Sequence, residues 1–311
     1  MEEIALALGG GGIKGIAHLG VVFALQDAGY RIGAIAGTSS GGIAGAAIAS
    51  GADRSALYDA IRTIQTSNFF SRQEHDGPSL LGLSGVVKML SPFLNGKTFD
   101  DLNIPFAVTA VDIKTRQEYI LNRGSVIDAV VATSSIPGVF PPVKMGAAEL
   151  VDGGVVDPVP VAVTRWMAPK LPIIAVCLSP TPEKWAELPD LSVPIETKIP
   201  QTILQRVLNL RIGQAIRIFV ESYDITTHMI TELRLQVEKP DVVIRPDLVK
   251  YGILEKVDPD IYMRLGKEAV EKALPEIEEK LSWRHKLARQ FQNPQPPSKF
   301  LEDNPSIRRR E

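Results

Sequence analysis

One serine of this chain stands in the sequence context of an enzymatic nucleophile. Ser39 is the central residue of a Gly-x-Ser-x-Gly pentapeptide at residues 37–41. The apolar run 32–36 predicts a strand before it, and the small residues 42–50 predict a helix after it. A tight reversal from strand to helix strains the central residue and leaves its hydroxyl at the helix N-terminus. The pattern favours a nucleophile over a plain turn capped by Ser39 or Ser40.

A run of glycines near the N-terminus could stabilise the oxyanion that forms during acyl transfer. Residues 9–12 are all glycine, and they lie between an apolar strand pattern at 4–8 and a helical pattern that ends at Gly29. Glycine amides can turn toward a ligand and approach it closely, because no Cβ stands in the way. A second donor normally comes from the amide that follows the nucleophile. The candidate donors are therefore the N–H groups of Gly10, Gly11, Gly12 and Ser40.

The same glycines also permit a nucleotide-binding interpretation. Residues 10–15 satisfy Gly-x-Gly-x-x-Gly between a strand pattern and a helix pattern, as in a dinucleotide site. Such a site needs an acidic residue at the end of the second strand, and residues 37–39 provide none. The Gly-Lys-Ser/Thr signature of a P-loop is missing at the required spacing as well. A nucleotide-binding protein is therefore the weaker alternative.

A serine nucleophile needs a general base, and the histidines of this chain are poorly placed to supply it. A Ser-His-Asp triad normally draws its histidine from a loop after a strand. None of the four histidines has that context, and His228, within a helical run, is the least unfavourable. The four are His18, His75, His228 and His285.

A carboxylate can replace the histidine if it is held against the serine in a poorly solvated site. Asp152 ends the apolar strand pattern 149–151, and the two glycines at 153–154 permit a close approach of backbones. Burial would raise the proton affinity of this carboxyl toward that of a useful base. Taken alone, an Asp-Gly pair also fits an ordinary turn. Asp157, which precedes Pro158, has the pattern of a turn residue.

Together these segments resemble the patatin-like phospholipase family, in order and in type. The matching segments are Gly10-Gly11-Gly12-Ile13-Lys14-Gly15, Gly37-Thr38-Ser39-Ser40-Gly41, Asp152-Gly153-Gly154 and the proline-containing segment 132–142. The similarity covers roughly residues 4–200, and residues 241–281 are similar to the shorter bacterial members. Residues 68–95 and 201–236 match no motif of the family.

The resemblance implies roles for the matching positions. Ser39 would be the nucleophile and Asp152 its partner in a Ser–Asp dyad that dispenses with histidine. Gly37 and Gly41 would be the elbow glycines, and the glycine loop with Ser40 would form the oxyanion hole. Lys14 takes the place of a basic residue that supports this loop and is commonly arginine in the family.

The resemblance also implies an activity. Members of the family cleave acyl esters of lipids through an acyl-enzyme, without a metal or other cofactor. We therefore expect a hydrolase of phospholipids or lysophospholipids. The alternative within the same fold is a catalytically silent lipid-binding or regulatory protein.

Strand patterns alternate with helix patterns along the chain, which predicts an α/β fold with a mostly parallel sheet. The resemblance specifies a three-layer α/β/α sandwich. We expect a single domain over residues 1–285, with the motif-bearing core in 4–200 and a helical, late-strand extension in 201–285. The polar, proline-rich residues 286–311 predict a flexible tail.

Two apolar segments fit a lipid substrate but also have plainer explanations. Residues 68–95 gather large apolar side chains among glycines and prolines, and either cover an apolar cleft or fold onto the core. The amphipathic run 201–236 predicts a long helix or a helix pair, which suits an acyl chain or an interfacial contact. It equally suits the core or a self-association surface. The oligomeric state is left open.

The composition is that of an ordinary globular protein, with 45% apolar and 23% charged residues among 311. A net charge of −2 argues against a nucleic-acid partner. A single cysteine excludes an intramolecular disulfide framework. The acidic first residues lack the basic region of a signal peptide, and no apolar run of about 18 residues could span a bilayer. We expect a cytoplasmic protein, with peripheral contact to a membrane left open.

Overall fold

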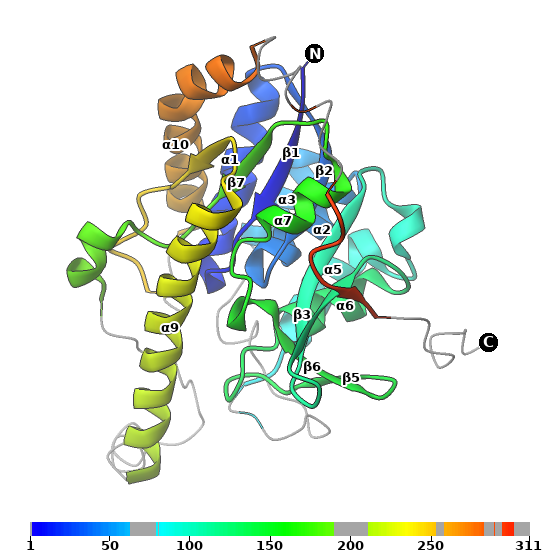
Figure 1. The fold of residues 1–311 in the computed structure, drawn as a ribbon. Coiled ribbons are helices and arrows are strands. Elements are labelled where there is room, and N and C mark those ends of the chain that lie inside the picture. The colour runs from blue at the N-terminus through cyan, green and yellow to red at the C-terminus, as the bar shows by residue number, and fades with distance from the viewer. Residues whose placement is uncertain are drawn as a thin grey trace.

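The structure is a computed structural model that describes most of the chain. It covers residues 2–62, 79, 81–189, 211–252, 258–282, 289 and 294–301, with the backbone alone at 211–213 and 215–217. These residues form a three-layer α/β/α sandwich around one mostly parallel sheet (Figure 1). The predicted fold class is therefore confirmed. The predicted single domain over 1–285 stays a prediction.

The central sheet is parallel in its middle and antiparallel at one side. Its main path runs β5-β6-β3-β2-β1-β7-β8, and β4 pairs with both β3 and β9. The pairs among β3, β2, β1, β7 and β8 are parallel, whereas β6 joins β3 and β5 in the antiparallel sense. The strands are β1 (Glu2–Leu8), β2 (Tyr30–Gly37), β3 (Phe106–Asp112), β4 (Gln117–Leu121), β5 (Val143–Met145), β6 (Ala148–Asp152), β7 (Ile173–Val176), β8 (Val242–Ile244) and β9 (Lys299–Phe300).

Helices cover both faces of this sheet. One face packs against α1 (Ile16–Asp27), α2 (Ser40–Ala49), α3 (Arg54–Arg62), α5 (Ser84–Leu94), α6 (Val126–Thr133) and α10 (Pro259–Lys280). The other face packs against α7 (Val161–Met167) and the C-terminal part of α9 (Arg211–Glu238). The short 3-10 helices are η1 (Gly12–Gly15), η2 (Phe99–Asp101), η3 (Gly153–Val155) and η4 (Pro182–Glu187).

The alternation of side chains along β1 sets the two layers. Ile4, Leu6 and Leu8 point into the large core beneath α1 and α2. Ala5 and Ala7 point to the opposite face, where they pack with residues of α7 and β7. Large residues on one side and small ones on the other let α7 lie close to the strands. Because β1 and β2 are parallel neighbours, their C-terminal ends lie side by side, and the glycine loop and the serine turn begin there.

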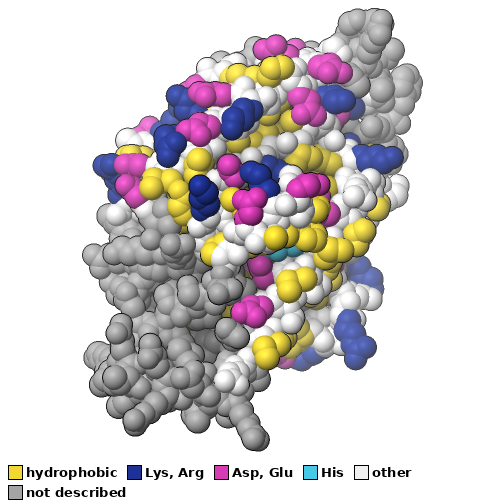
Figure 2. Space-filling view, turned by 90° about the vertical axis from the view of Figure 1, so that its left-hand side faces the viewer, with side chains coloured by type: hydrophobic (Ala, Val, Ile, Leu, Met, Phe, Trp, Pro, Cys, Tyr) yellow, Lys and Arg dark blue, Asp and Glu magenta, His cyan; other side chains and the backbone are white. Residues whose placement is uncertain are grey.

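The long amphipathic pattern at 201–236 is a single helix, α9, in the part that the structure describes. Figure 1 shows it in yellow-green, running beside the sheet and extending beyond it. Figure 2 looks onto this side of the molecule, where several large apolar side chains of α9 are exposed. They are Ile218, Phe219, Ile225, Met229, Leu233 and Val237. Residues 201–210 lie outside the described chain.

The apolar segment 68–95 is described only in part, because residues 68–78 and 80 lie outside the described chain. Its second half forms α5, and Val86, Leu90 and Leu94 of this helix are buried in the main core. No helix in the described ranges is long and apolar enough to cross a membrane.

Part of the expected flexible tail is placed against the sheet. Lys299 and Phe300 form the short strand β9, which pairs in parallel with Tyr119 and Ile120 of β4. The ring of Phe300 packs on Trp166, with ring centroids 5.0 Å apart. The apolar contact explains why two residues in a polar segment join the sheet. Residues 302–311 lie outside the described chain.

Candidate active site

Ser39 occupies a strained turn between β2 and α2. Its backbone angles are φ 55° and ψ −123°, in a region that residues with a side chain rarely adopt. Two hydrogen bonds hold the turn: the Ser39 N–H donates to Thr133 Oγ1 at 3.0 Å, and the Gly41 N–H donates to the Thr38 carbonyl at 2.9 Å. Strain that the surroundings maintain is typical of functional sites. The turn predicted from residues 37–41 is present.

The elbow tolerates only glycine at position 41. A Cβ on Gly41 would lie 2.0 Å from the carbonyl oxygen of Leu8, the last residue of β1. A Cβ on Gly37 would lie 2.5 Å from the carbonyl oxygen of Gly41. The glycines therefore let the first turn of α2 pack directly on the ends of β1 and β2. This contact brings the serine next to the glycine loop that follows β1.

Asp152 reaches the serine because β3 extends past the end of β2. Phe106 to Val108 of β3 pair with the last three residues of β2, and Val108 also pairs with β4 on the opposite edge. Further along, Ala110 pairs with Asp152, while β4 still occupies the other edge. β6 therefore continues the edge that β2 leaves, and its last residue stands just beyond the serine turn.

The carboxyl of Asp152 is buried, with 1% of the residue exposed, and Ser39 beside it is 7% exposed. Burial raises the pKa of Asp152 to about 7, against hydrogen bonds from the Ser39 hydroxyl and the Gly154 N–H, which lower it. The Gly154 N–H lies 2.7 Å from Asp152 Oδ1. A carboxyl with a pKa near neutrality can exchange a proton with a neighbouring hydroxyl.

The glycine loop lies against the serine, as a Cβ on Gly10 would lie 3.3 Å from Ser39 Cβ. The N–H of Gly10 itself donates to the carbonyl of Pro158 at 3.0 Å, so this predicted donor is occupied within the protein. Within the described chain no hydrogen bond occupies the N–H groups of Gly11, Gly12 and Ser40. These three amides can therefore donate to a ligand.

Two buried basic side chains lie beneath the glycine loop. His18 Nε2 lies 2.7 Å from the Gly9 carbonyl, and burial lowers the pKa of His18 to about 4, so it is neutral and donates this bond. Lys14 is buried as well. Burial raises the pKa of Asp224 on α9, and the charges of His228 and of Lys14 lower it in part. Asp224 Oδ2 in turn lies 3.3 Å from His228 Nδ1. His75 and His285 lie outside the described residues.

Helix α9 forms one wall of the site, which no sequence motif indicates. The hydroxyl of Tyr223 lies 3.3 Å from the position of a Cβ on Gly154, and Asp152 Oδ1 lies 2.9 Å from the same position. Asp224 and His228 on the same helix face Lys14. The polar residues 223, 224, 227 and 228 recur at helical spacing, and this stripe was the available signal.

An apolar pocket opens beside these groups, between α1, α2, α3 and α5. Its lining is almost entirely apolar and includes Ala47, Leu57, Leu90 and Phe93. Gly12 and Ser40, which carry two of the open amides, also line it. Among the described residues, no group of three or more His, Cys, Asp or Glu side chains could hold a metal ion. The site thus offers a serine beside a buried carboxyl, open amides and an apolar cavity.

Comparisons with known proteins show which family the chain resembles. A family model described as "Patatin-like phospholipase" matches residues 6–165. The NTE family protein Rv2565 of Mycobacterium tuberculosis is 31% identical over 285 residues, which cover 88% of this chain and 46% of that protein. "Lysophospholipase NTE1" of Saccharomyces cerevisiae is 30% identical over 174 residues, 53% of this chain and 10% of that protein. The chain thus spans less than half the length of these relatives.

A solved structure is similar in fold. The crystal structure of VipD from Legionella pneumophila aligns with a TM-score of 0.52 and 12% sequence identity, over 90% of this chain and 67% of that one. At this identity the similarity concerns the fold alone.

Proposed function

Because this chain belongs to the patatin-like phospholipase family, we propose that it is a serine acyl hydrolase that cleaves fatty acyl esters of lysophospholipids or phospholipids. The observation that carries the proposal is the meeting of the Ser39 hydroxyl with the buried Asp152 carboxyl, whose pKa is about 7. A base with this pKa is half ionised near neutral pH and can still drive proton transfer.

In the first half-reaction, Asp152 accepts the proton of the Ser39 hydroxyl as the serine oxygen attacks the ester carbonyl. The N–H groups of Gly11, Gly12 and Ser40 donate to the developing oxyanion. The tetrahedral intermediate then collapses, and the leaving alcohol takes the proton from Asp152. The product of this step is an acyl-enzyme on Ser39.

In the second half-reaction, Asp152 takes a proton from a water molecule that attacks the acyl-enzyme. The same amides stabilise the second oxyanion. When this intermediate collapses, Ser39 recovers its proton from Asp152 and the fatty acid leaves. One carboxyl thus serves as base and acid in both halves, without a histidine.

The apolar pocket supports a lipid substrate. The Gly12 and Ser40 amides line this pocket. If they bind the carbonyl of a fatty acyl ester, the acyl chain can enter the pocket between α1, α2, α3 and α5. Burying each methylene of such a chain contributes about 0.8 kcal/mol. The name of the yeast relative, a lysophospholipase, points to the same chemical class.

The test is a hydrolysis assay on a panel of lysophospholipids, phospholipids and simple acyl esters, with the products identified by mass spectrometry. We expect release of a fatty acid by the wild-type chain and none by Ser39→Ala. A catalytically silent lipid-binding protein would bind panel members without releasing any product. Hydrolysis by Ser39→Ala at the wild-type rate would refute the proposal.

A further inference from the structure

Two consecutive carbonyl groups join the loops of the site. The Asp157 carbonyl accepts a hydrogen bond from Thr38 Oγ1 at 2.8 Å, and Thr38 directly precedes the serine. The Pro158 carbonyl accepts the Gly10 N–H at 3.0 Å, at the start of the glycine loop. Asp152 lies a few residues earlier on this same segment. The position of residues 157–158 therefore sets the serine turn, the glycine loop and the carboxyl relative to one another.

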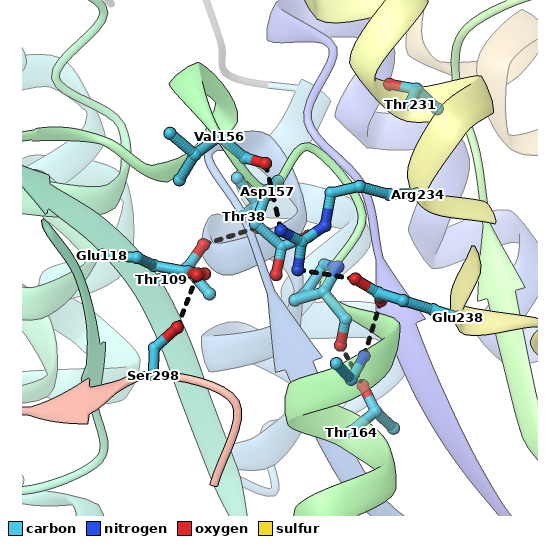
Figure 3. A network of polar contacts seen from close by, with 12 residues as sticks. Thr38, Thr109, Glu118, Val156, Asp157, Thr164, Thr231, Arg234, Glu238 and Ser298 are labelled. Atoms are coloured by element: carbon cyan, nitrogen blue, oxygen red, sulfur yellow. Dashed lines mark hydrogen bonds and ion pairs between the residues drawn. The ribbon is translucent and has the colours of Figure 1, made fainter. Parts of the chain in front are cut away.

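The side chain of Asp157, which the sequence predicts to be a turn residue, is fully buried. Arg234 of α9 holds it, with Nε 3.0 Å from Asp157 Oδ1, and the same guanidinium donates to the Val156 carbonyl at 3.3 Å. A second nitrogen of Arg234 lies 2.6 Å from Glu238 Oε1. Glu238 also accepts the Ala162 N–H at 2.8 Å, at the start of α7. Figure 3 shows these groups converging on Asp157.

A second carboxyl meets Asp157 from the side of β4. Glu118 lies against the Asp157 side chain, and Ser298 Oγ donates to Glu118 Oε2 at 2.5 Å (Figure 3). Burial raises the pKa of Asp157, the charge of Glu118 raises it further, and Arg234 lowers it. Asp157 is thus held between a helix on one side and a strand on the other.

A buried ion pair of this kind needs an explanation other than stability. Removing the Asp157 carboxylate and most of the Arg234 side chain from water costs several kcal/mol, and apolar residues of similar volume often give an equally stable protein. What the contact adds is geometry, because one guanidinium lies against the Asp157 carboxyl and also donates a hydrogen bond to the carbonyl of Val156, the residue before it.

We propose that Asp157 and Arg234 are positioning residues that fix segment 153–158, so that Asp152 and the glycine loop keep their places around Ser39. The inference rests on the proposed hydrolase activity. Neither side chain touches the reacting atoms. Both act through the bonds from Thr38 and Gly10 to the carbonyls at 157–158.

The test compares Arg234→Met with Arg289→Met. Arg289 forms a buried ion pair with Asp241 at 2.8 Å, where Asp241 also accepts the N–H of Ile173 at the start of β7. That pair lies at the N-terminal ends of β7 and β8, whereas the site lies at the C-terminal ends of β1 and β2. Arg289→Met therefore controls for the loss of a buried ion pair alone. Each variant is assayed on a chromogenic acyl ester well below its own unfolding midpoint, and kcat, KM and the rate of inactivation by a fluorophosphonate are measured.

We expect Arg234→Met to lower kcat and the inactivation rate by about 10- to 100-fold, because a displacement of about 1 Å has effects of this size. KM should stay within about twofold, since the acyl pocket is untouched. The kcat of Arg234→Lys should fall between those of Arg234→Met and the wild type, because lysine keeps the positive charge but lacks the planar guanidinium with its several N–H donors. Arg234→Lys is the variant to measure if Arg234→Met does not fold. Arg289→Met should lose stability and keep kcat.

A wild-type kcat in folded Arg234→Met and Arg234→Lys would overturn the inference, as would an equal loss in Arg289→Met. Failure of the proposed function itself has a different signature. In that case Ser39→Ala would be labelled and active like the wild type, whatever the Arg234 variants do.

Discussion

Gly37 and Asp152 pair with the same edge of β3, and Asp152 lies two residues further along it. Gly37, the last residue of β2, pairs with Val108 of β3, and Asp152, the last residue of β6, pairs with Ala110. The two registers differ by two residues, a step of roughly 7 Å along β3. A parallel strand and an antiparallel strand thus end almost head to head. The turn after the first carries Ser39, and the end of the second carries its partner carboxyl.

The pKa of Asp152 predicts how the rate depends on pH. Burial raises that pKa to about 7, and a general base acts only when deprotonated. We predict that kcat/KM rises as the pH increases through about 7 and levels off about one unit higher. A pH–rate profile on an ester whose ionisation does not change in this range measures this. A rate that is constant from about pH 5.5 to about pH 8 would contradict a buried base.

The same shift predicts that Asp152 makes the fold less stable as the pH rises. The folded state keeps the proton between the ordinary pKa of 3.8 and about 7, whereas the unfolded state releases it. The unfolding free energy therefore falls as the pH increases through this window. Asp152→Asn cannot ionise and should exceed the wild type in stability at pH 8 by about 1–3 kcal/mol. Thermal unfolding at about pH 4 and at about pH 8 measures this, and the difference should vanish at the lower pH.

We predict that the lack of a side chain at Gly154 keeps the Asp152 carboxyl in place beside Ser39. A Cβ at this position would lie 2.9 Å from Asp152 Oδ1 and 3.3 Å from the Tyr223 hydroxyl. We expect Gly154→Ala to lower kcat by about tenfold or more, because the carboxyl must move from the serine. Gly29→Ala is the control, since Gly29 has φ +91° and open space around it. That variant should lose about 1 kcal/mol of stability and keep its kcat, and the opposite pattern would refute the assignment.

The apolar pocket predicts a dependence on acyl chain length. Ala47 lines the pocket on α2, and Ala47→Leu would place three additional carbon atoms in it. We expect the variant to lose activity on long-chain acyl esters by about tenfold while keeping its activity on acetyl and butyryl esters. The ratio of long-chain to short-chain kcat/KM measures this independently of how much enzyme is folded. An unchanged ratio would show that the chain lies elsewhere.

The motif residues could be found from the sequence because each stands at the end of a strand next to glycines. Ser39 and Asp152 follow apolar runs, and the flanking glycines mark the close backbone contacts that the structure shows at Gly37 and Gly41. The order of strand and helix patterns was enough to predict a mostly parallel sheet between helices. The antiparallel pairing of β6, which places Asp152, depends on tertiary contacts and had no local signal.

The position of α9 beside the site could not be predicted either, because it also depends on tertiary contacts. Tyr223 and Arg234 lie far along the chain from the motifs, and only the packing of the helix brings them to the site. Asp157 has the sequence of a turn, and its burial follows from the partners that α9 and β4 supply. The two-residue strand β9 lies in a polar segment and is too short for a periodic pattern.

The most direct test of the account concerns the identity of the base. Ser39→Ala, Asp152→Asn and His228→Ala are compared by hydrolysis of a chromogenic acyl ester and by labelling with a fluorophosphonate, after circular dichroism has shown that each is folded. We predict no activity and no label in Ser39→Ala, a loss of at least about 100-fold in Asp152→Asn, and the larger part of the activity in His228→Ala. If Asp152→Asn keeps most of the activity and His228→Ala loses it, the Ser39–Asp152 dyad is wrong.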